Sequence, residues 1–138
     1  MPIIPYLYYQ DVAAARRFLA RAFGFRNFGP SNRGKDGSLI HAAMKLDKDV
    51  VMMGDPGAKY RGPRKLGAAT QCLLLTVPEI DKLFARAVKA GATVLQEPSD
   101  TPFGQRRFGV EDSEGHQWYF AQPVKRKASK RGRARSSG

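Results

Sequence analysis

Two strand–helix units in the same order predict an α+β fold of two tandem βαβββ modules, which form a curved mixed sheet with the helices on the outside. Each helix has one apolar face, and three short strand candidates follow it. The two helices contain a similar four-residue sequence, Leu19-Ala20-Arg21-Ala22 in the first and Phe84-Ala85-Arg86-Ala87 in the second, which indicates an internal repeat. At 138 residues, the chain suits one globular unit with a substantial core.

The first module begins with residues 3–9, which are apolar and aromatic enough for a strand. Asp11 then opens a helix that Gly24 ends. The apolar face of this helix consists of Val12, Ala15, Leu19 and Ala22. The strand candidates after it are residues 25–28, 39–46 and 50–53, with an exposed loop at 29–35 and a tight turn at 47–49.

The second module repeats this order. Residues 72–77 form a buried type of strand, and a helix follows that Gly91 ends. Its apolar face consists of Ile80, Leu83, Phe84, Ala87 and Val88. The later strand candidates are residues 93–96, 105–111 and 116–121, with a turn at 112–115. The predicted organisation is a first module at 1–54, a connecting loop at 55–70, a second module at 71–123 and a basic tail at 124–138.

The basic charge is concentrated in the tail. Residues 125–138 hold seven Lys or Arg and no acid, and the whole chain carries a net charge of +12. Because the tail has no apolar residue larger than Ala, we expect it to be disordered in isolation. The single cysteine, Cys72, rules out an intramolecular disulfide, and no stretch reads as a signal peptide or membrane span. We therefore expect a cytoplasmic protein that does not contact membranes.

Several motifs resemble the glyoxalase/bleomycin-resistance/extradiol-dioxygenase superfamily, also called vicinal oxygen chelate proteins. The opening run Pro5-Tyr6-Leu7-Tyr8-Tyr9-Gln10-Asp11-Val12 is similar to the first strand and helix of that superfamily. The run Asp112-Ser113-Glu114-Gly115-His116-Gln117-Trp118 is similar to its final D-x-x-G-H-x-W hairpin. The resemblance covers about residues 3–122 and implies a fold more specifically than a reaction.

The resemblance also implies four metal-ligand positions, at about Pro5, Met52, Cys72 and Tyr119. None of these is His or a carboxylate, and the thiol of Cys72 alone cannot make a site for a divalent ion, which needs several carboxylate, imidazole or thiolate ligands. Gln71 becomes available if the register slips by one residue, but an amide and a thiol are still a poor set. We therefore expect no metal and no cofactor.

The concave side of the sheet is the expected ligand site. If Tyr119 faces it, as the resemblance implies, Trp118 and Phe120 point to the helix side, and Leu7 and Tyr9 face the ligand. The candidate ligand-binding residues are Leu7, Tyr9, His41, Met52, Cys72, Leu74, Arg107 and Tyr119. The alternative is that these side chains only pack on one another.

The histidines and a pair of arginines add detail to this site. His41 begins a strand and could contact the ligand, whereas His116 follows a turn glycine and is expected to hydrogen-bond the turn. Arg106 and Arg107 are adjacent in a strand, so one of them faces the concave side and favours an anionic group. No catalytic residue is assigned.

Three functions remain in competition. The leading one is metal-free binding of a small, aromatic or anionic molecule by a homodimer, since members of the superfamily commonly complete their sites across a two-fold contact. The second is a metal-dependent or metal-free lyase, isomerase or dioxygenase, so whether the chain is an enzyme stays open. The third is weak, salt-dependent nucleic-acid contact through residues 125–138.

Overall fold

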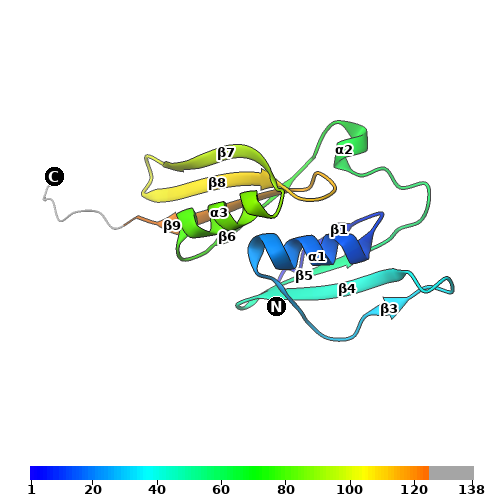
Figure 1. The fold of residues 1–138 in the computed structure, drawn as a ribbon. Helices are drawn as coiled ribbons and strands as arrows, with labels where there is room; N and C mark the ends of the chain where they lie inside the picture. Colours follow the sequence, from blue (N-terminus) through cyan, green and yellow to red (C-terminus); the bar gives the residue numbers. More distant parts are fainter. Residues whose placement is uncertain (125–138) are drawn as a thin grey trace, which may run out of the picture.

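The computed structural model describes residues 1–124 and contains two mixed sheets with helices on their outer side (Figure 1). Residues 125–138, which are all of the predicted basic tail except Val124, lie outside the described residues. The first module consists of β1 (Tyr6–Tyr8), α1 (Val12–Phe23), β2 (Arg26–Asn27), β3 (Asn32–Arg33), β4 (Leu39–Leu46) and β5 (Asp49–Gly54). A connection with α2 (Pro63–Leu66) leads to β6 (Cys72–Thr76), α3 (Ile80–Lys89), β7 (Thr93–Asp100), β8 (Gln105–Glu111) and β9 (Gln117–Pro123).

Each module folds its strands into a sheet of its own. The first sheet has the order β1-β5-β4-β2, with β3 also on β4, and the second has the order β6-β9-β8-β7. In both, the first strand pairs in parallel with the last strand of the module, and the remaining pairs are antiparallel. The predicted βαβββ order and α+β class are confirmed, although the ladders form two sheets rather than a single one.

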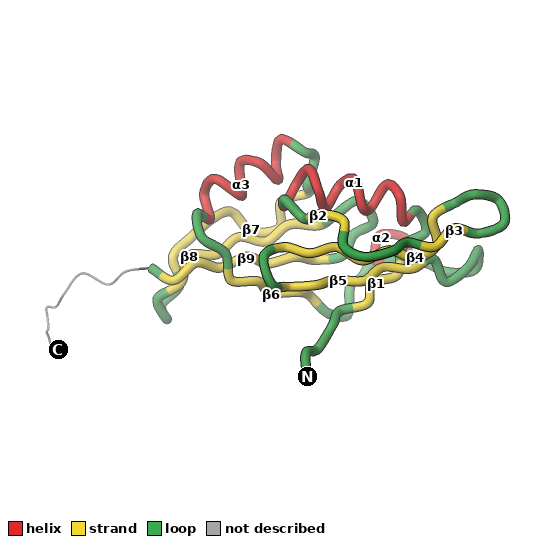
Figure 2. Tube along the Cα trace, turned by 90° about the horizontal axis from the view of Figure 1, so that it is seen from below, coloured by secondary structure: helices red, strands yellow, loops and turns green. Residues whose placement is uncertain are grey.

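Both long helices lie on the same side of the two sheets and contact each other (Figure 2). α1 begins where Asp11 accepts a 2.9 Å hydrogen bond from the backbone N–H of Ala14, and it ends at Gly24, whose φ of 86° is left-handed. These are the start and end that the sequence predicts. Within residues 1–124, no helix is long and apolar enough to span a membrane.

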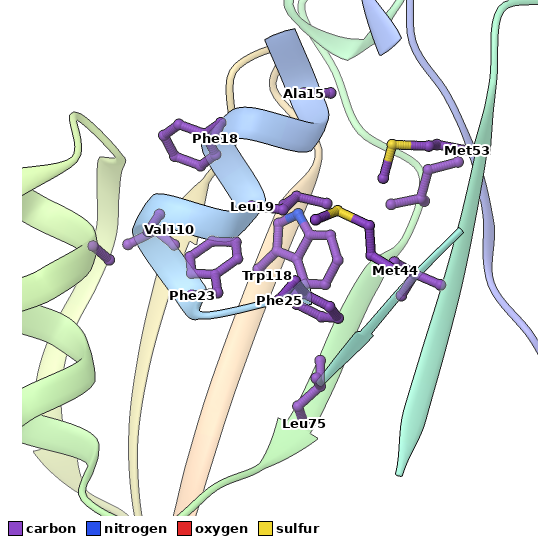
Figure 3. Packing of buried hydrophobic residues seen from close by; sticks show 14 of the residues in the cluster. Ala15, Phe18, Leu19, Phe23, Phe25, Met44, Met53, Leu75, Val110 and Trp118 are labelled. Atoms are coloured by element: carbon purple, nitrogen blue, oxygen red, sulfur yellow. The ribbon is translucent and has the colours of Figure 1, made fainter. Parts of the chain in front are cut away.

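One hydrophobic core lies between the helices and the sheets and joins the modules (Figure 3). Phe23 of α1 packs against Trp118 and Phe120 of β9, with ring centroids 5.3 and 4.9 Å apart. Phe25 and Met44 extend the same cluster in the first module. Trp118 and Phe120 are fully buried, so the predicted alternation of β9 is confirmed.

A buried polar cluster also connects the modules. The carboxylate of Asp112, in the turn before β9, accepts hydrogen bonds from the Tyr9 hydroxyl and from the Trp118 indole N–H at 3.0 Å. Its other oxygen accepts the backbone N–H groups of Glu114 and His116. Asp112 is 2% exposed, and four donors compensate for the loss of water around its charge.

The second module caps α1 at both ends. The Glu114 carboxylate accepts the backbone N–H groups of Gln10 and Asp11 at 2.8 and 2.9 Å. At the other end, the Arg86 guanidinium of α3 donates to the carbonyls of Ala20 and Arg21 at 3.0 and 2.8 Å. A carboxylate at the N-terminus and a cation at the C-terminus both complement the helix dipole.

Candidate functional site

The faces of both sheets that point away from α1 and α3 are called the open face. Both long helices lie on the other side (Figure 2), while Pro63 and Leu66 of α2 line a cavity at the β1 and β6 edges of this face. Strand pairing places Tyr6 beside Met52 in the first sheet, and Leu74 beside Tyr119 in the second. The ligand-binding residues predicted from sequence that lie on this face are His41, Met52, Cys72, Leu74, Arg107 and Tyr119, and the structure adds Tyr6 and Tyr8.

Leu7 and Tyr9 do not face this side, which corrects the expectation from sequence. Leu7 pairs with Met53 and is 8% exposed, and Tyr9 is fully buried with its hydroxyl on Asp112. The side chains beside them, Tyr6 and Tyr8, are half exposed on the open face instead. β1 is only three residues long, so the sequence offered too little alternation to fix its facing.

Tyr6 and His41 form a hydrogen-bonded pair on the first sheet. The Tyr6 hydroxyl lies 3.0 Å from His41 Nδ1, and the two rings stack with centroids 5.7 Å apart. Gly54 lies beneath this pair, where a Cβ atom would meet the Tyr6 hydroxyl. A phenol beside an imidazole can pass a proton or bind a polar ligand group.

His116 has a structural position. Its backbone N–H donates to Asp112, as expected for the turn, and its Nε2 lies 2.8 Å from the carbonyl oxygen of Tyr8. Its ring also meets that of Tyr9 edge-on at 4.8 Å. The ring therefore joins the second module to β1.

A cavity of about 460 Å³ lies between the neighbouring edges of β1 and β6. Cys72 is exposed beside it, and Tyr60 and Arg61 of the connecting segment line it. The Tyr60 hydroxyl donates to the Tyr8 carbonyl at 3.0 Å, and partial burial, followed by the charges of Glu114 and Asp112, raises the pKa of Tyr60. Its hydroxyl is therefore a donor at neutral pH. A second cavity, of about 560 Å³, continues between the chain before β1, the start of β5 and the end of β6 and includes Leu74.

Tyr60 and Arg61 were not predicted as site residues. They lie in the segment that the sequence identified only as a connection, and no periodic pattern marks them. Long loops often carry functional residues. An aromatic and a basic side chain between two glycines of this loop was therefore the one sequence signal that could have identified them.

The donors at the four implied metal positions do not suit a divalent ion. Met52 offers a thioether, Cys72 a thiol and Tyr119 a phenol, while Pro5 has no side-chain donor. Within residues 1–124, no three His, Cys, Asp or Glu side chains are grouped to hold an ion. The imidazole of His41, on the open face, is hydrogen-bonded to the Tyr6 hydroxyl.

Arg106 and Arg107 point to opposite faces of β8, as predicted. Arg106 lies on the helix side and makes ion pairs with Asp81 and Asp100, each at 3.0 Å. Arg107 lies on the open face, with its guanidinium carbon 5.9 Å from the centre of the Tyr119 ring. The inward arginine expected from the sequence is therefore Arg107.

Comparison with known proteins gives consistent results. The family model described as the glyoxalase/bleomycin resistance protein/dioxygenase superfamily matches residues 4–120. An uncharacterized protein of Mycobacterium bovis is 38% identical over 126 residues, covering 88% of this chain and 82% of the relative. An uncharacterized protein of Mycobacterium tuberculosis is also 38% identical, over 88% of this chain and 74% of its own length.

Solved structures agree in fold. TioX from Micromonospora sp. ML1 superposes with a TM-score of 0.71 and 29% identity, covering 90% of this chain and 99% of TioX. A glyoxalase-related enzyme from Clostridium phytofermentans gives 0.68 at 12% identity, covering 90% and 95%. The fosfomycin resistance protein FosX from Listeria monocytogenes gives 0.67 at 11% identity, covering 90% and 93%. The last two likenesses concern the fold alone.

Proposed function

Because this chain belongs to the glyoxalase/bleomycin resistance protein/dioxygenase superfamily, we propose that it binds a small aromatic or anionic molecule on its open face without a metal. The observation that carries this proposal is an aromatic and apolar surface that neither long helix covers. Tyr6, Tyr8 and Leu74 are 49%, 50% and 53% exposed there, beside the cavities between β1 and β6. Contiguous exposed apolar surface of this kind, with a few polar groups, is typical of ligand sites.

The ligand would lie across both sheets. Tyr119 and Leu74 would contact its flat body, while the Tyr6–His41 pair and the Tyr60 hydroxyl offer neutral hydrogen bonds. Cys72 lines the cavity between β1 and β6, together with Tyr6 and Tyr60, as a small apolar contact. Each polar group named here is already held by a protein partner, so little ordering is needed when a ligand binds.

The test is titration of the full chain with the neutral fluorophore phenylnaphthylamine. We expect saturable binding at one site per chain, and at least tenfold weaker binding after Leu74→Glu, which puts a charge against the apolar ligand. Val88→Glu is the matched control, because Val88 is similarly exposed but lies on α3. Non-saturable binding, or equal effects of the two substitutions, would overturn the proposal.

The Tyr6–His41 pair supports an enzyme as the second candidate. A phenol 3.0 Å from an imidazole can exchange a proton with a bound substrate, so metal-free lyase or isomerase chemistry is compatible with this face. A metal-dependent reaction, including a dioxygenase, would need ligands other than those at the implied positions. Elemental analysis after exposure to zinc, nickel, manganese and iron, followed by dialysis, tests that form: about one ion per chain would contradict the metal-free proposal.

We further propose that the protein is a homodimer. The chain before β1 exposes Ile3 almost completely and Ile4 by 40%, and both line the cavity at the start of β5. A second copy that packs here would cover apolar surface that one chain leaves in water. Sedimentation equilibrium should give twice the chain mass, and a monomer at micromolar concentration would refute this assembly.

A further inference from the structure

Arg107 differs from its neighbour in having no acidic partner. Arg106 donates to both oxygens of Asp81 and to Asp100. Among residues 1–124, no carboxylate lies within 4.0 Å of the Arg107 guanidinium, and its Nε is buried without a hydrogen-bond partner. A partly buried cation with an unsatisfied N–H is costly for the protein to maintain.

Two aromatic rings flank this cation. Its guanidinium carbon stands 5.9 Å from the centre of the Tyr119 ring and 6.0 Å from that of Phe103. Phe103 lies in the turn before β8 and is 64% exposed, so its ring is available to a ligand. Both distances suit cation–π contact, which holds the guanidinium without neutralising its charge.

The strand neighbours of Arg107 are small. Arg107 pairs with Ser99 on β7 and with Ala121 on β9, and both have short side chains. Two residues along β8, Gly109 lies beneath the Tyr119 ring, where any Cβ atom would collide with it. The glycine thus lets Tyr119 lie close against the sheet beside the guanidinium.

We propose that Arg107 is the anion anchor of the open face, and that its ligand is a planar aromatic molecule bearing a carboxylate or a similar acid. The acid would pair with the guanidinium fork, which matches a carboxylate through two parallel hydrogen bonds. The ring would stack against Phe103 and Tyr119. This inference rests on the proposed ligand-binding function and specifies the class of ligand for the same face.

The test compares two probes that share one aromatic skeleton. Anilinonaphthalene sulfonate carries the acid group, and phenylnaphthylamine lacks it. We expect the full chain to bind the sulfonate at least tenfold more tightly, and Arg107→Gln to remove this preference while changing the affinity for the neutral probe less than twofold. Arg107→Lys keeps the positive charge but not the planar guanidinium, so it should retain part of the preference for the sulfonate. Arg17→Gln on the exposed side of α1 is the matched control and should change neither affinity.

The outcomes separate the two proposals. If the wild type binds neither probe, the proposed function itself is wrong. If it binds both, but Arg107→Gln keeps the preference for the sulfonate, the function stands and the anchor is wrong. Competition by benzoate but not by benzamide would support an aromatic acid. Equal competition by inorganic phosphate would overturn the aromatic part, because the site would then bind anions in general.

Discussion

A single buried carboxylate, that of Asp112, organises contacts between parts of the chain that are distant in sequence. It accepts the Tyr9 hydroxyl from the end of the first strand and the Trp118 indole from the last. Hydrogen bonds to a charged group contribute more than neutral ones, and removing the shared acceptor leaves several buried donors unsatisfied. Loss of the Asp112 carboxylate should therefore destabilise the fold strongly.

We expect Asp112→Ala to lower the free energy of unfolding by about 3 kcal/mol or more, since the Tyr9 and Trp118 donors would remain buried without an acceptor. Urea denaturation followed by tryptophan fluorescence measures this loss. Glu97→Ala is the control, because Glu97 is exposed and should change stability by less than about 0.5 kcal/mol. Similar losses in the two variants would show that the cluster does not stabilise the fold.

Tyr9 gives the stability of the protein a specific dependence on alkaline pH. Burial, and then the negative charge of Asp112, raises the pKa of Tyr9 well above 10.0. Below pH 10 the folded and unfolded chains both keep this proton. At higher pH the unfolded chain releases it while the folded chain retains it, so this contribution to stability is lost as pH rises toward the folded pKa.

The measurement compares the wild type with Tyr9→Phe, which cannot ionise. Between about pH 8 and pH 10, the difference in unfolding free energy should be constant. Above pH 10 the wild type should lose stability relative to the variant by up to about 1.4 kcal/mol per pH unit. A difference that stays constant to about pH 11 would contradict the raised pKa.

For individual side chains, the sequence correctly predicted which side of the sheet Tyr119 faces, but it was wrong for Leu7 and Tyr9. Tyr119 was placed correctly because Trp118 and Phe120, on either side of it, are large and apolar and alternate with it. Leu7 and Tyr9 were misplaced because every residue from Tyr6 to Tyr9 is apolar or aromatic. Only the pairing with β5 and the contact of Tyr9 with Asp112 determine that facing.

Among the elements, α1 depends on the second module at both ends. Glu114 caps its first turn, and Arg86 satisfies its last carbonyls. An isolated helix of twelve residues is marginal in water, so these contacts contribute to its order. The element is thus stabilised by tertiary contacts as well as by its own sequence.

Arg86→Ala should therefore destabilise the protein by about 1 to 2 kcal/mol, because two carbonyls at the end of α1 lose their donor. Thermal unfolding followed by circular dichroism detects this change. Lys89→Ala is the matched control on the same helix, since Lys89 is also exposed and cationic. If both substitutions cost the same, the cross-module cap contributes nothing measurable.

The elements that the sequence did not predict are those too short to carry a pattern. β3 has two residues and forms by pairing with β4, inside a segment expected to be a loop. α2 has four residues, and Arg64 holds it to the turn after β8 through the carbonyls of Asp112 and Ser113. In contrast, both long helices and β8 follow their periodic patterns closely.

For the whole molecule, the relation between the modules could not be read from sequence. Periodicity identifies each βαβββ unit but not which surfaces meet, because that depends on side chains from both. In the structure, the shared core, the Asp112 cluster and the capping of α1 join the modules of one chain. These contacts all lie at the helix side or in the turns, so they do not cover the open face.

The basic tail holds seven Lys or Arg residues, which can neutralise phosphates without reading a base sequence. The last described backbone hydrogen bond runs from Val124 to the carbonyl of Gly104, so a chain that ends at Val124 keeps the contacts of both modules. Ending the chain there should leave the unfolding free energy and phenylnaphthylamine binding unchanged.

Weak binding of double-stranded DNA should be lost from the chain that ends at Val124. For the full chain, the affinity should fall steeply with salt, with a log–log slope of at most about six if all seven cations contact phosphates. A full-length variant with Gln at those seven positions controls for tail length and should behave like the truncated chain. Fluorescence anisotropy of a labelled duplex at several salt concentrations makes the comparison. An affinity that survives either change would place nucleic-acid binding on the folded modules, because the only cations removed are those of the tail.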